Sequence, residues 1–179
     1  MKLSLIFLDT FTGIEYLHHR LAEPIVHQNI SAANILLDQD FSPHLSDCAL
    51  QRLFADDIVF SILKTSAAMG YLAPEYATVG RLTLQSDIYA FGKILLQLLT
   101  GVIKDISRDN SSTSSVHCSL KTLVECGKVE EFMDPRLDGK YSVAEATNLA
   151  EIALACTREI ASERPPMDAV VQRFETGIN

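Results

Sequence analysis

The sequence predicts a mainly α-helical domain that carries one small β-hairpin, and three observations support this fold class. Residues 86–100 are apolar on nearly every side, which is typical of a helix buried in the centre of a domain. Residues 142–156 and 167–174 carry apolar side chains at helical spacing. Residues 35–45 contain two short strand-like runs around a polar turn, as a hairpin does.

The first expected element is a helix near the N-terminus. Its apolar positions recur at helical spacing: Phe7, Phe11, Ile14 and Leu17. The first eight residues, with one basic residue and a brief apolar run, weakly resemble a signal peptide. Because Asp9 interrupts that run and no small-residue cleavage site follows, a helix is the better interpretation.

The hairpin brings two polar residues to the same end. Asn34 precedes the first strand, residues 35–37, and Asp47 follows the return strand, which ends at Leu45. A carboxamide oxygen and a carboxylate placed together can share a hard cation such as Mg²⁺. The plainer alternative is that Asn34 caps a turn and Asp47 is a solvated loop acid.

The later helices carry start and stop signals. Ser86 is expected to cap the central helix, and Gly101 is expected to end it in a left-handed turn. Ser142 and Glu145 form the S-x-x-E pattern of a capping box at the start of the next long helix.

Two segments lack a clean period and are expected to be irregular. Residues 51–69 are long and mixed, and their hydroxyls at Ser61, Thr65 and Ser66 are possible phosphoacceptors, although exposed loop hydroxyls are usually only solvated. Residues 105–117 are rich in Ser and Asn and read as a flexible loop without a site.

Composition excludes several classes of protein. A chain of 179 residues has the size of one domain with a substantial core. Its hydrophobic fraction of 47% and charged fraction of 21% fit a folded globular chain rather than a disordered one. The net charge of -8 argues against nucleic acid or an anionic membrane surface as the main partner, because phosphate binding requires clustered Lys and Arg.

The four cysteines and the apolar runs set further limits. Cys48, Cys118, Cys126 and Cys156 show no C-x-x-C spacing, so they read as reduced thiols rather than as a disulfide or zinc framework. No stretch approaches the roughly 18 apolar residues that a membrane-spanning helix requires, so no transmembrane segment is expected in this chain.

Seven motifs follow one another along the chain. They are H-Q-N-I-S-A-A-N at 27–34, D-C-A at 47–49, G-Y-L-A-P-E-Y at 70–76, T-L-Q-S-D-I-Y-A-F-G at 83–92, D-P-R-L at 134–137, A-C-T at 155–157 and R-P-P-M at 164–167. The first three resemble the catalytic loop H-R-D-x-K-x-x-N, the D-F-G magnesium motif and the A-P-E motif of eukaryotic protein kinases. Taken together and in order, the motifs resemble those of plant leucine-rich-repeat receptor-like kinases.

This resemblance implies a protein-kinase-like C-terminal lobe over residues 1–179. Within it, residues 25–50 would be the catalytic-loop region, 47–75 the activation segment and 84–179 the helical core. Fewer than about thirty residues precede the loop, and Gly13 is the only glycine among them, so the N-terminal lobe with its glycine-rich strand turn is expected to be absent.

Departures from the family pattern fall on the groups that carry out the chemistry. Asn29 stands where the family has the Asp that accepts the substrate proton, and an amide oxygen cannot take a proton at neutral pH. Ser31 replaces the Lys that stabilises the transferred phosphate. Gln28 replaces an Arg, while Cys48 and Ala49 replace the Phe and Gly of D-F-G.

The residue types that bind metal in the family remain at Asn34 and Asp47. Mg²⁺ and ATP are therefore implied by resemblance only. Because half of the nucleotide site belongs to the expected missing lobe, we expect this chain to bind neither.

Four residues are expected to have structural roles by resemblance. His27 belongs to the loop itself, and Asp87 would accept hydrogen bonds from backbone N–H groups of that loop, or simply favour the first turn of its helix as an acid. Arg164 would pair with Glu75 of A-P-E, or else be a solvated loop cation. We favour the pair because both flanking motifs match well.

The resulting functional expectation is a catalytically inactive signalling module that binds other kinase domains or signalling proteins. By resemblance it would lie in the cytoplasm, at the cytosolic side of the plasma membrane in a full receptor. One alternative is a Ser/Thr kinase whose missing lobe is supplied by a fuller chain. Another is a truncated gene product without a function of its own.

Overall fold

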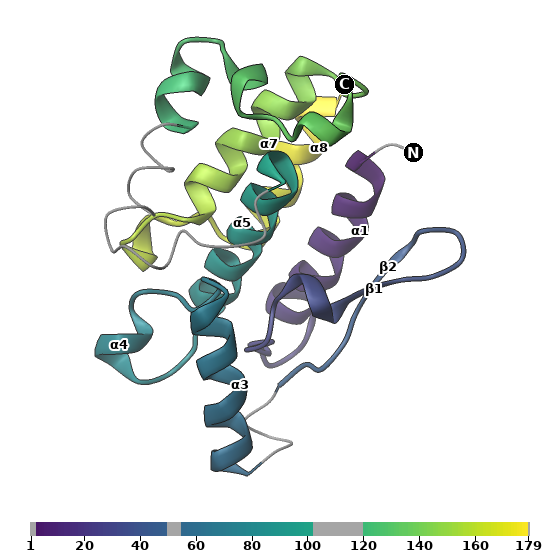
Figure 1. The fold of residues 1–179 in the computed structure, drawn as a ribbon. Helices are drawn as coiled ribbons and strands as arrows, with labels where there is room; N and C mark the ends of the chain where they lie inside the picture. The colour runs from purple at the N-terminus through teal and green to yellow at the C-terminus, as the bar shows by residue number, and fades with distance from the viewer. Residues whose placement is uncertain (1–2, 50–54, 102–119, 179) are drawn as a thin grey trace.

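The computed structural model describes residues 3–49, 55–101 and 120–178, and it confirms a mainly helical fold with one small hairpin (Figure 1). Its long helices are α1 (Leu3–Glu15), α3 (Asp56–Ala68), α5 (Leu84–Thr100), α7 (Val143–Cys156) and α8 (Met167–Ile178). Shorter helical pieces are the π-turn Tyr16–Arg20, the 3₁₀ turns Ala32–Asn34, Val129–Phe132, Pro135–Leu137 and Ala161–Glu163, and α4 (Tyr76–Val79). The strands are β1 (Ile35–Leu37) and β2 (Pro43–Leu45).

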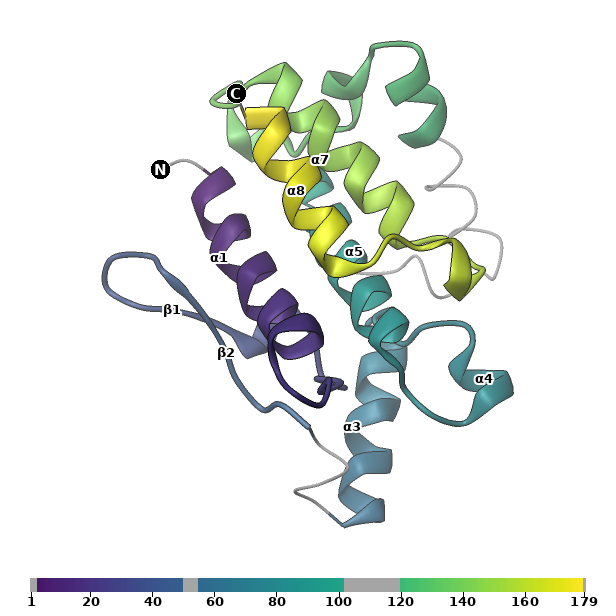
Figure 2. The same cartoon turned by 180° about the vertical axis from the view of Figure 1, so that it is seen from behind.

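Helix α5 runs through the centre of the helical part, as its apolar composition predicts. It packs against α7, while α1 packs against α8 on one side and β2 on the other, and the two opposite views agree on this arrangement (Figures 1 and 2). Phe11 of α1 joins these layers, because its ring lies 4.7 Å from that of Phe91 in α5 and 4.8 Å from that of Phe174 in α8. All three rings are buried, and the edge-on contact between Phe11 and Phe91 adds to the free energy of burial.

Helix α5 has its N-cap three residues earlier than expected. Thr83, and not Ser86, occupies the N-cap position, and Ser86 is the third helical residue, whose hydroxyl accepts a hydrogen bond from the Thr83 N–H at 3.0 Å. The two residues form a reciprocal capping box, which satisfies more of the free N–H groups at a helix start than a single cap does. At the other end Gly101 has φ 69°, so the expected left-handed turn is confirmed.

The hairpin is confirmed with the expected strands. Ile35 pairs with Leu45 and Leu37 pairs with Pro43 in antiparallel register. One step beyond, the Asn34 carbonyl accepts a hydrogen bond from the Ser46 N–H at 2.9 Å. Asn34 and the chain just before Asp47 therefore lie at the same end of the hairpin.

Residues 56–68 correct the expectation of an irregular segment, because they form helix α3. Val59 and Leu63 are buried, and with partly buried neighbours they form a small apolar cluster separate from the main core. Asp56 and Asp57 lie in the first turn, where acidic side chains interact favourably with the helix dipole. The apolar contact of one helix face thus outweighs the absence of a regular sequence period.

The two C-terminal helices follow their predicted apolar stripes. Ser142 caps α7, its hydroxyl accepting a hydrogen bond from the Glu145 N–H at 3.4 Å. All but one of the predicted inward residues of the two helices are buried, namely Leu149, Ile152, Ala153, Cys156, Met167, Val170 and Phe174, while the predicted Val171 is only partly buried. The loop expected at 105–117 and Cys118 lie outside the described residues.

Three of the four cysteines lie in the described ranges. Cys48, Cys126 and Cys156 form no disulfide within the described residues. Burial raises the pKa of the Cys156 thiol to about 12, so this thiol stays protonated in the core. Of the helices in the described ranges, none has the length and apolar character needed to cross a membrane.

Candidate functional site

The loop at residues 27–34 is held in place by one buried carboxylate at the start of α5. Asp87 Oδ2 accepts a hydrogen bond from the His27 N–H at 2.7 Å, and Oδ1 accepts one from the Gln28 N–H at 2.9 Å. His18 Nε2 lies 3.0 Å from Asp87 Oδ2. Asp87 is only 2% exposed, so these contacts compensate the loss of its hydration. Both readings of Asp87 hold together, because it also lies in the first turn of its helix.

His27 joins this loop to the segment that follows the hairpin. Its side chain is fully buried, its Nδ1 accepts a hydrogen bond from the Asn29 N–H at 3.3 Å, and its carbonyl accepts one from the Ala49 N–H at 2.8 Å. In the described part of the chain, Nε2 has no hydrogen-bond partner. Burial lowers the pKa of His27, and the nearby Asp87 carboxylate opposes this shift only in part. The imidazole is therefore neutral at pH 7.

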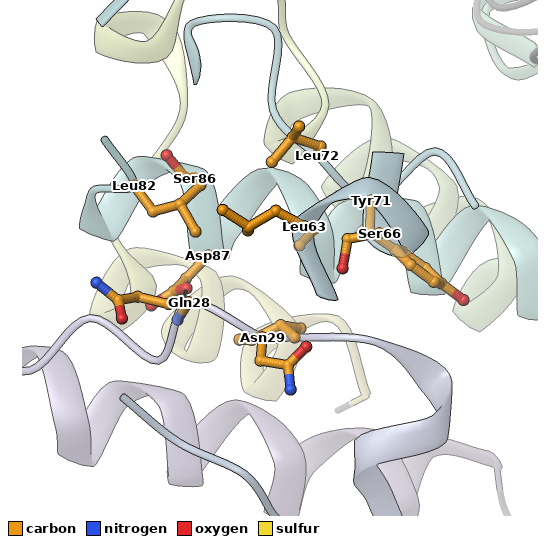
Figure 3. Close-up of a pocket in the computed structure, with 11 residues that line it drawn as sticks. Gln28, Asn29, Leu63, Ser66, Tyr71, Leu72, Leu82, Ser86 and Asp87 are labelled. Carbon is orange, nitrogen blue, oxygen red and sulfur yellow. Dashed lines mark hydrogen bonds between the residues drawn. The ribbon is translucent and has the colours of Figure 1, made fainter. Parts of the chain in front are cut away.

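Asn29 lies under α3. It is 9% exposed, and it lines a small cavity of about 20 Å³ together with Leu63 and Ser66 of that helix. Figure 3 shows the loop with Gln28 and Asn29 on one side of this cavity and the side chains from α3 on the other. Helix α3 therefore covers one side of Asn29, which also lines the larger groove beside α5.

Ser31 and Asn34 lie further along the same loop. Asn34 Nδ2 donates a hydrogen bond to the Asn29 carbonyl at 2.8 Å, which closes the loop on itself. Ser31 is half-buried and, with Asn34, lines the edge of a larger groove beside α5. A neutral hydroxyl at Ser31 supplies no positive charge to this edge.

Asp47 gives a partial fit to a magnesium site. Its side chain is exposed, with Oδ2 3.3 Å from the Ser46 hydroxyl, and it stands at the hairpin end that also holds Asn34. Within residues 3–49, 55–101 and 120–178, no group of three or more His, Cys, Asp or Glu side chains is arranged to hold a metal. One carboxylate and one amide oxygen suit Mg²⁺ only when substrate phosphates complete the coordination shell.

The D-C-A segment adopts an unusual backbone. Asp47 has φ 56° and Ala49 has φ 59°, in the left-handed region that favours glycine. By resemblance Ala49 takes the place of a glycine, and its Cβ in this conformation adds strain of roughly 1–2 kcal/mol. The backbone thus keeps a glycine-like conformation with a residue that disfavours it.

Glu75 and Arg164 form the expected ion pair. Arg164 NH1 donates to Glu75 Oε1 and NH2 donates to Oε2, both at 2.8 Å, and the Arg164 side chain is fully buried. Arg164 also donates to the carbonyls of Arg158 and Gln85, at 2.7 and 2.9 Å. Burial is the largest single influence and would raise the pKa of Glu75, but the hydrogen bonds and charge of Arg164, together with hydrogen bonds from the backbone and Ser86, hold that pKa below its usual value.

A family model described as protein tyrosine and serine/threonine kinase matches residues 1–174. The chain belongs to the protein kinase family. Its fold agrees, since the pseudokinase domain of BIR2, described as an immune regulator of the RLK/Pelle family, superposes with a TM-score of 0.77 at 32% identity over 98% of this chain and 51% of that one.

Curated relatives from Arabidopsis thaliana are receptor-like kinases. The chain is 36% identical to a probable LRR receptor-like serine/threonine-protein kinase over 91% of its own length and 17% of that protein. It is 34% identical to the proline-rich receptor-like protein kinase PERK2 over 93% of its length and 24% of that protein. This kinase-family chain therefore spans about a quarter or less of these two relatives.

Sequence reasoning missed several residues of the site in this kinase-family chain. Leu63 and Ser66, which cover Asn29, lie in a segment that was expected to be irregular, although Val59, Leu63 and Ser66 share the helical spacing i, i+4, i+7. The hydrogen bond from the Tyr71 hydroxyl to Gln97 Oε1, at 2.6 Å, carries no sequence signal.

Proposed function

We propose that this chain is a C-terminal-lobe region of a receptor-like kinase domain that does not transfer phosphate and acts as a protein-interaction module in signalling. The observation that carries the proposal is Asn29 in the position of the proton-accepting Asp. An amide there cannot act as general base, a loss that typically costs about 10²- to 10⁴-fold in rate. The proposed location is the cytosolic side of the plasma membrane.

Two further features support the absence of transfer. Ser31 leaves the loop without the fixed positive charge that stabilises a transferring phosphate. Leu63 and Ser66 of helix α3 cover one side of Asn29, so a substrate hydroxyl would have to approach it from the groove beside α5. Each feature acts on a different requirement of the reaction, namely charge stabilisation and access.

One observation favours a second candidate, a weakly active Ser/Thr kinase. Asn34 and Asp47 stay together at one end of the hairpin, and in the family these residue types hold Mg²⁺. If bound, that ion would neutralise charge on the ATP phosphates. The loop residues Asn29 and Ser31 would still lack the base and the cation.

Other kinase domains are the proposed partners. The support is similarity to receptor-like kinases and to a pseudokinase described as an immune regulator. An interaction role needs a folded surface but no proton transfer, so it is compatible with the altered loop.

The first test is incorporation of labelled phosphate from ATP and Mg²⁺ into a generic Ser/Thr substrate. We expect the wild-type chain and the Asn29→Asp, Ser31→Lys double variant to stay at the level of a heat-killed control. Incorporation by the wild-type chain above that control would overturn the proposed inactivity. Because the chain covers part of its relatives only, the reverse changes, Asp to Asn and Lys to Ser, are placed in the matching loop of an active receptor-like kinase. There we expect a loss of at least about 10²-fold.

The second test addresses the interaction role. Purified kinase domains of several receptor-like kinases are titrated into the chain by isothermal titration calorimetry. Saturable binding to at least one domain is the expected result. No heat with any domain would favour the view that the chain has no function of its own.

A further inference from the structure

A groove of about 640 Å³ shares Asn29, Ser31 and Asn34 with the candidate site and extends well beyond it. It lies between the loop at 27–34, helix α3 and the C-terminal half of α5. Its apolar lining comes from all three: Ala32, Ala33, Ile62, Met69, Ile94 and Leu98. Cavities of a few hundred to about 1,000 Å³ with mainly apolar walls are the usual size and character of small-molecule sites.

The charged side chains among the described residues that line this groove already neutralise each other. They are Asp134 and Arg136, and the Arg136 Nε lies 3.0 Å from Oδ1 and 2.9 Å from Oδ2 of Asp134. Arg136 NH2 also donates to the Gly101 carbonyl at 3.2 Å. Because no uncompensated charge faces the groove, a charged ligand would lose hydration without gaining an ion pair.

A small set of polar groups can orient a ligand. The Tyr71 hydroxyl donates to Gln97 Oε1 at 2.6 Å, so the amide N–H groups of Gln97 can donate to a ligand oxygen. The Ser31 hydroxyl stands at the loop edge of the same groove. We propose that the groove binds a small, uncharged, mainly apolar molecule that carries a hydrogen-bond-accepting oxygen, such as a carbonyl.

Such a molecule would also restrain α3. Ile62 and Met69 form one wall, at α3 and its C-terminal end, and Ile94 and Leu98 of α5 form another, so a ligand between them bridges the two helices. Asn29, Ser66 and Tyr71 line both this groove and the small cavity of Figure 3. A ligand that binds the covered arrangement more tightly than an open one shifts the population toward it. This inference holds whether or not the chain transfers phosphate, so it can fail independently of the proposed function.

Two fluorescent probes test the groove. Nile red is neutral and apolar with a carbonyl oxygen, and 8-anilinonaphthalene-1-sulfonate is apolar but anionic. In fluorescence titrations of the full chain we expect saturable Nile red binding that is at least about ten-fold tighter than binding of the sulfonate, a difference of about 1.4 kcal/mol. Equal or tighter binding of the anionic probe would overturn the choice of a neutral ligand.

Variants locate the binding. Ala33→Trp adds a bulky ring to the exposed loop edge of the groove and should weaken Nile red binding by at least about ten-fold. The matched control Leu37→Trp adds the same ring on the hairpin, where Leu37 is 48% exposed and outside the groove lining, and should leave binding within about two-fold. Gln97→Leu keeps the apolar wall but removes the donor and should also weaken binding. Unchanged affinity in Ala33→Trp with an unchanged circular dichroism spectrum would overturn the assignment.

Hydrogen exchange tests the bridging of the helices. With saturating Nile red, amides at residues 56–68 should exchange at least about three-fold more slowly, while those of α8 stay unchanged. Uniform protection of both helices, or none, would show that the probe does not bridge α3 and α5.

Discussion

Arg164 and Glu75 are 89 residues apart in sequence and meet in a two-pronged ion pair with both N–O distances at 2.8 Å. The guanidinium is fully buried, and the Glu75 side chain is 14% exposed. The Arg164 guanidinium also lies 4.9 Å from the ring centre of Tyr89 in α5. The pair therefore ties the A-P-E segment to the central helix and to the turn before α8.

Arg164→Ala should destabilise the domain by about 3–5 kcal/mol, because it leaves a desolvated carboxylate without its partner. Urea denaturation followed by circular dichroism measures the change. The control Arg158→Ala removes an exposed arginine that donates to the Glu163 carbonyl, and it should cost less than about 1 kcal/mol. A similarly small loss of stability in both variants would show that the pair stabilises the domain no more than a surface ion pair does.

Asp87→Asn should loosen the loop at residues 27–34. An amide keeps one accepting oxygen and turns an NH₂ group toward an N–H donor, so the His27 or Gln28 amide loses its partner. A buried unsatisfied donor costs about 1–3 kcal/mol. Hydrogen exchange of the His27 and Gln28 amides should accelerate.

The control for this loop variant is Asp138→Asn. Asp138 pairs with Lys140 on the surface, where both side chains are about 80% exposed, and its left-handed backbone suits Asn. In this control, the exchange rates of the His27 and Gln28 amides and the free energy of unfolding should stay as in the wild type. Equal exchange at His27 in both variants would contradict the role assigned to Asp87.

Helices α5, α7 and α8 could be predicted from sequence because their apolar stripes determine which face is buried. The ion pair of Arg164 with Glu75 could not, since no local spacing links two residues so far apart, and the expectation depended on family resemblance. Helix α3 was missed for a different reason. Val59 and Leu63 mark an inner face, but Ile58 and Phe60, 45% and 69% exposed, place apolar side chains on the outer face as well and blur the stripe.

The cover over Asn29 was likewise beyond sequence reasoning. The loop motif predicts that Asn29 stands at a catalytic position, but motif spacing says nothing about which later segment packs on it. That contact depends on where α3 lies in the fold. Helix α3 buries only a few apolar residues, so its sequence pattern does not show which part of the protein it packs against.

Lys93→Met should stabilise the protein at pH 7. Lys93 is a central α5 residue, 6% exposed, and burial lowers its pKa from the usual 10.5. Replacing a poorly solvated ammonium by an apolar side chain of similar length should gain about 1–3 kcal/mol. The same change at Lys121, which is largely exposed, should alter stability little.

The advantage of Lys93→Met should also depend on pH. The folded state loses the Lys93 proton at a lower pH than the unfolded state does, so the cost of the charge is complete below the folded pKa and disappears as pH rises toward 10.5. Denaturation at pH about 7 and about 10 should show a shrinking gap between variant and wild type. A constant gap, or a less stable variant at pH 7, would contradict this account.

Gly92→Ala should destabilise the protein although Ala favours helices. An added Cβ would lie 2.6 Å from Cys156 Cβ and 2.8 Å from Thr157 Cγ2, so α5 and α7 would have to separate. Overpacking of this kind costs about 1–3 kcal/mol. Thermal unfolding should show a lower Tm.

The helical control Gly13→Ala meets only the flexible end of Leu45, at 3.1 Å, and should change the free energy of unfolding by less than about 1 kcal/mol. A Tm for Gly92→Ala at or above that of the wild type would show that the two helices adjust freely.

Leu63→Ala should uncover Asn29 while leaving the main core folded. Leu63 is 5% exposed and, with Val59, forms the small cluster that holds α3, whereas the helices α5, α7 and α8 share a different cluster. A small apolar cluster supports only a low local opening free energy, so losing its larger member should let α3 open before the rest of the protein unfolds. Amides at 56–68 should exchange at least about ten-fold faster, and those of α5 should stay protected. Phe60→Ala, which truncates an exposed residue of the same helix, is the matched control and should leave exchange unchanged. Faster exchange throughout α5 as well as α3 would mean that α3 is part of the global folding unit and not a separable cover over the loop.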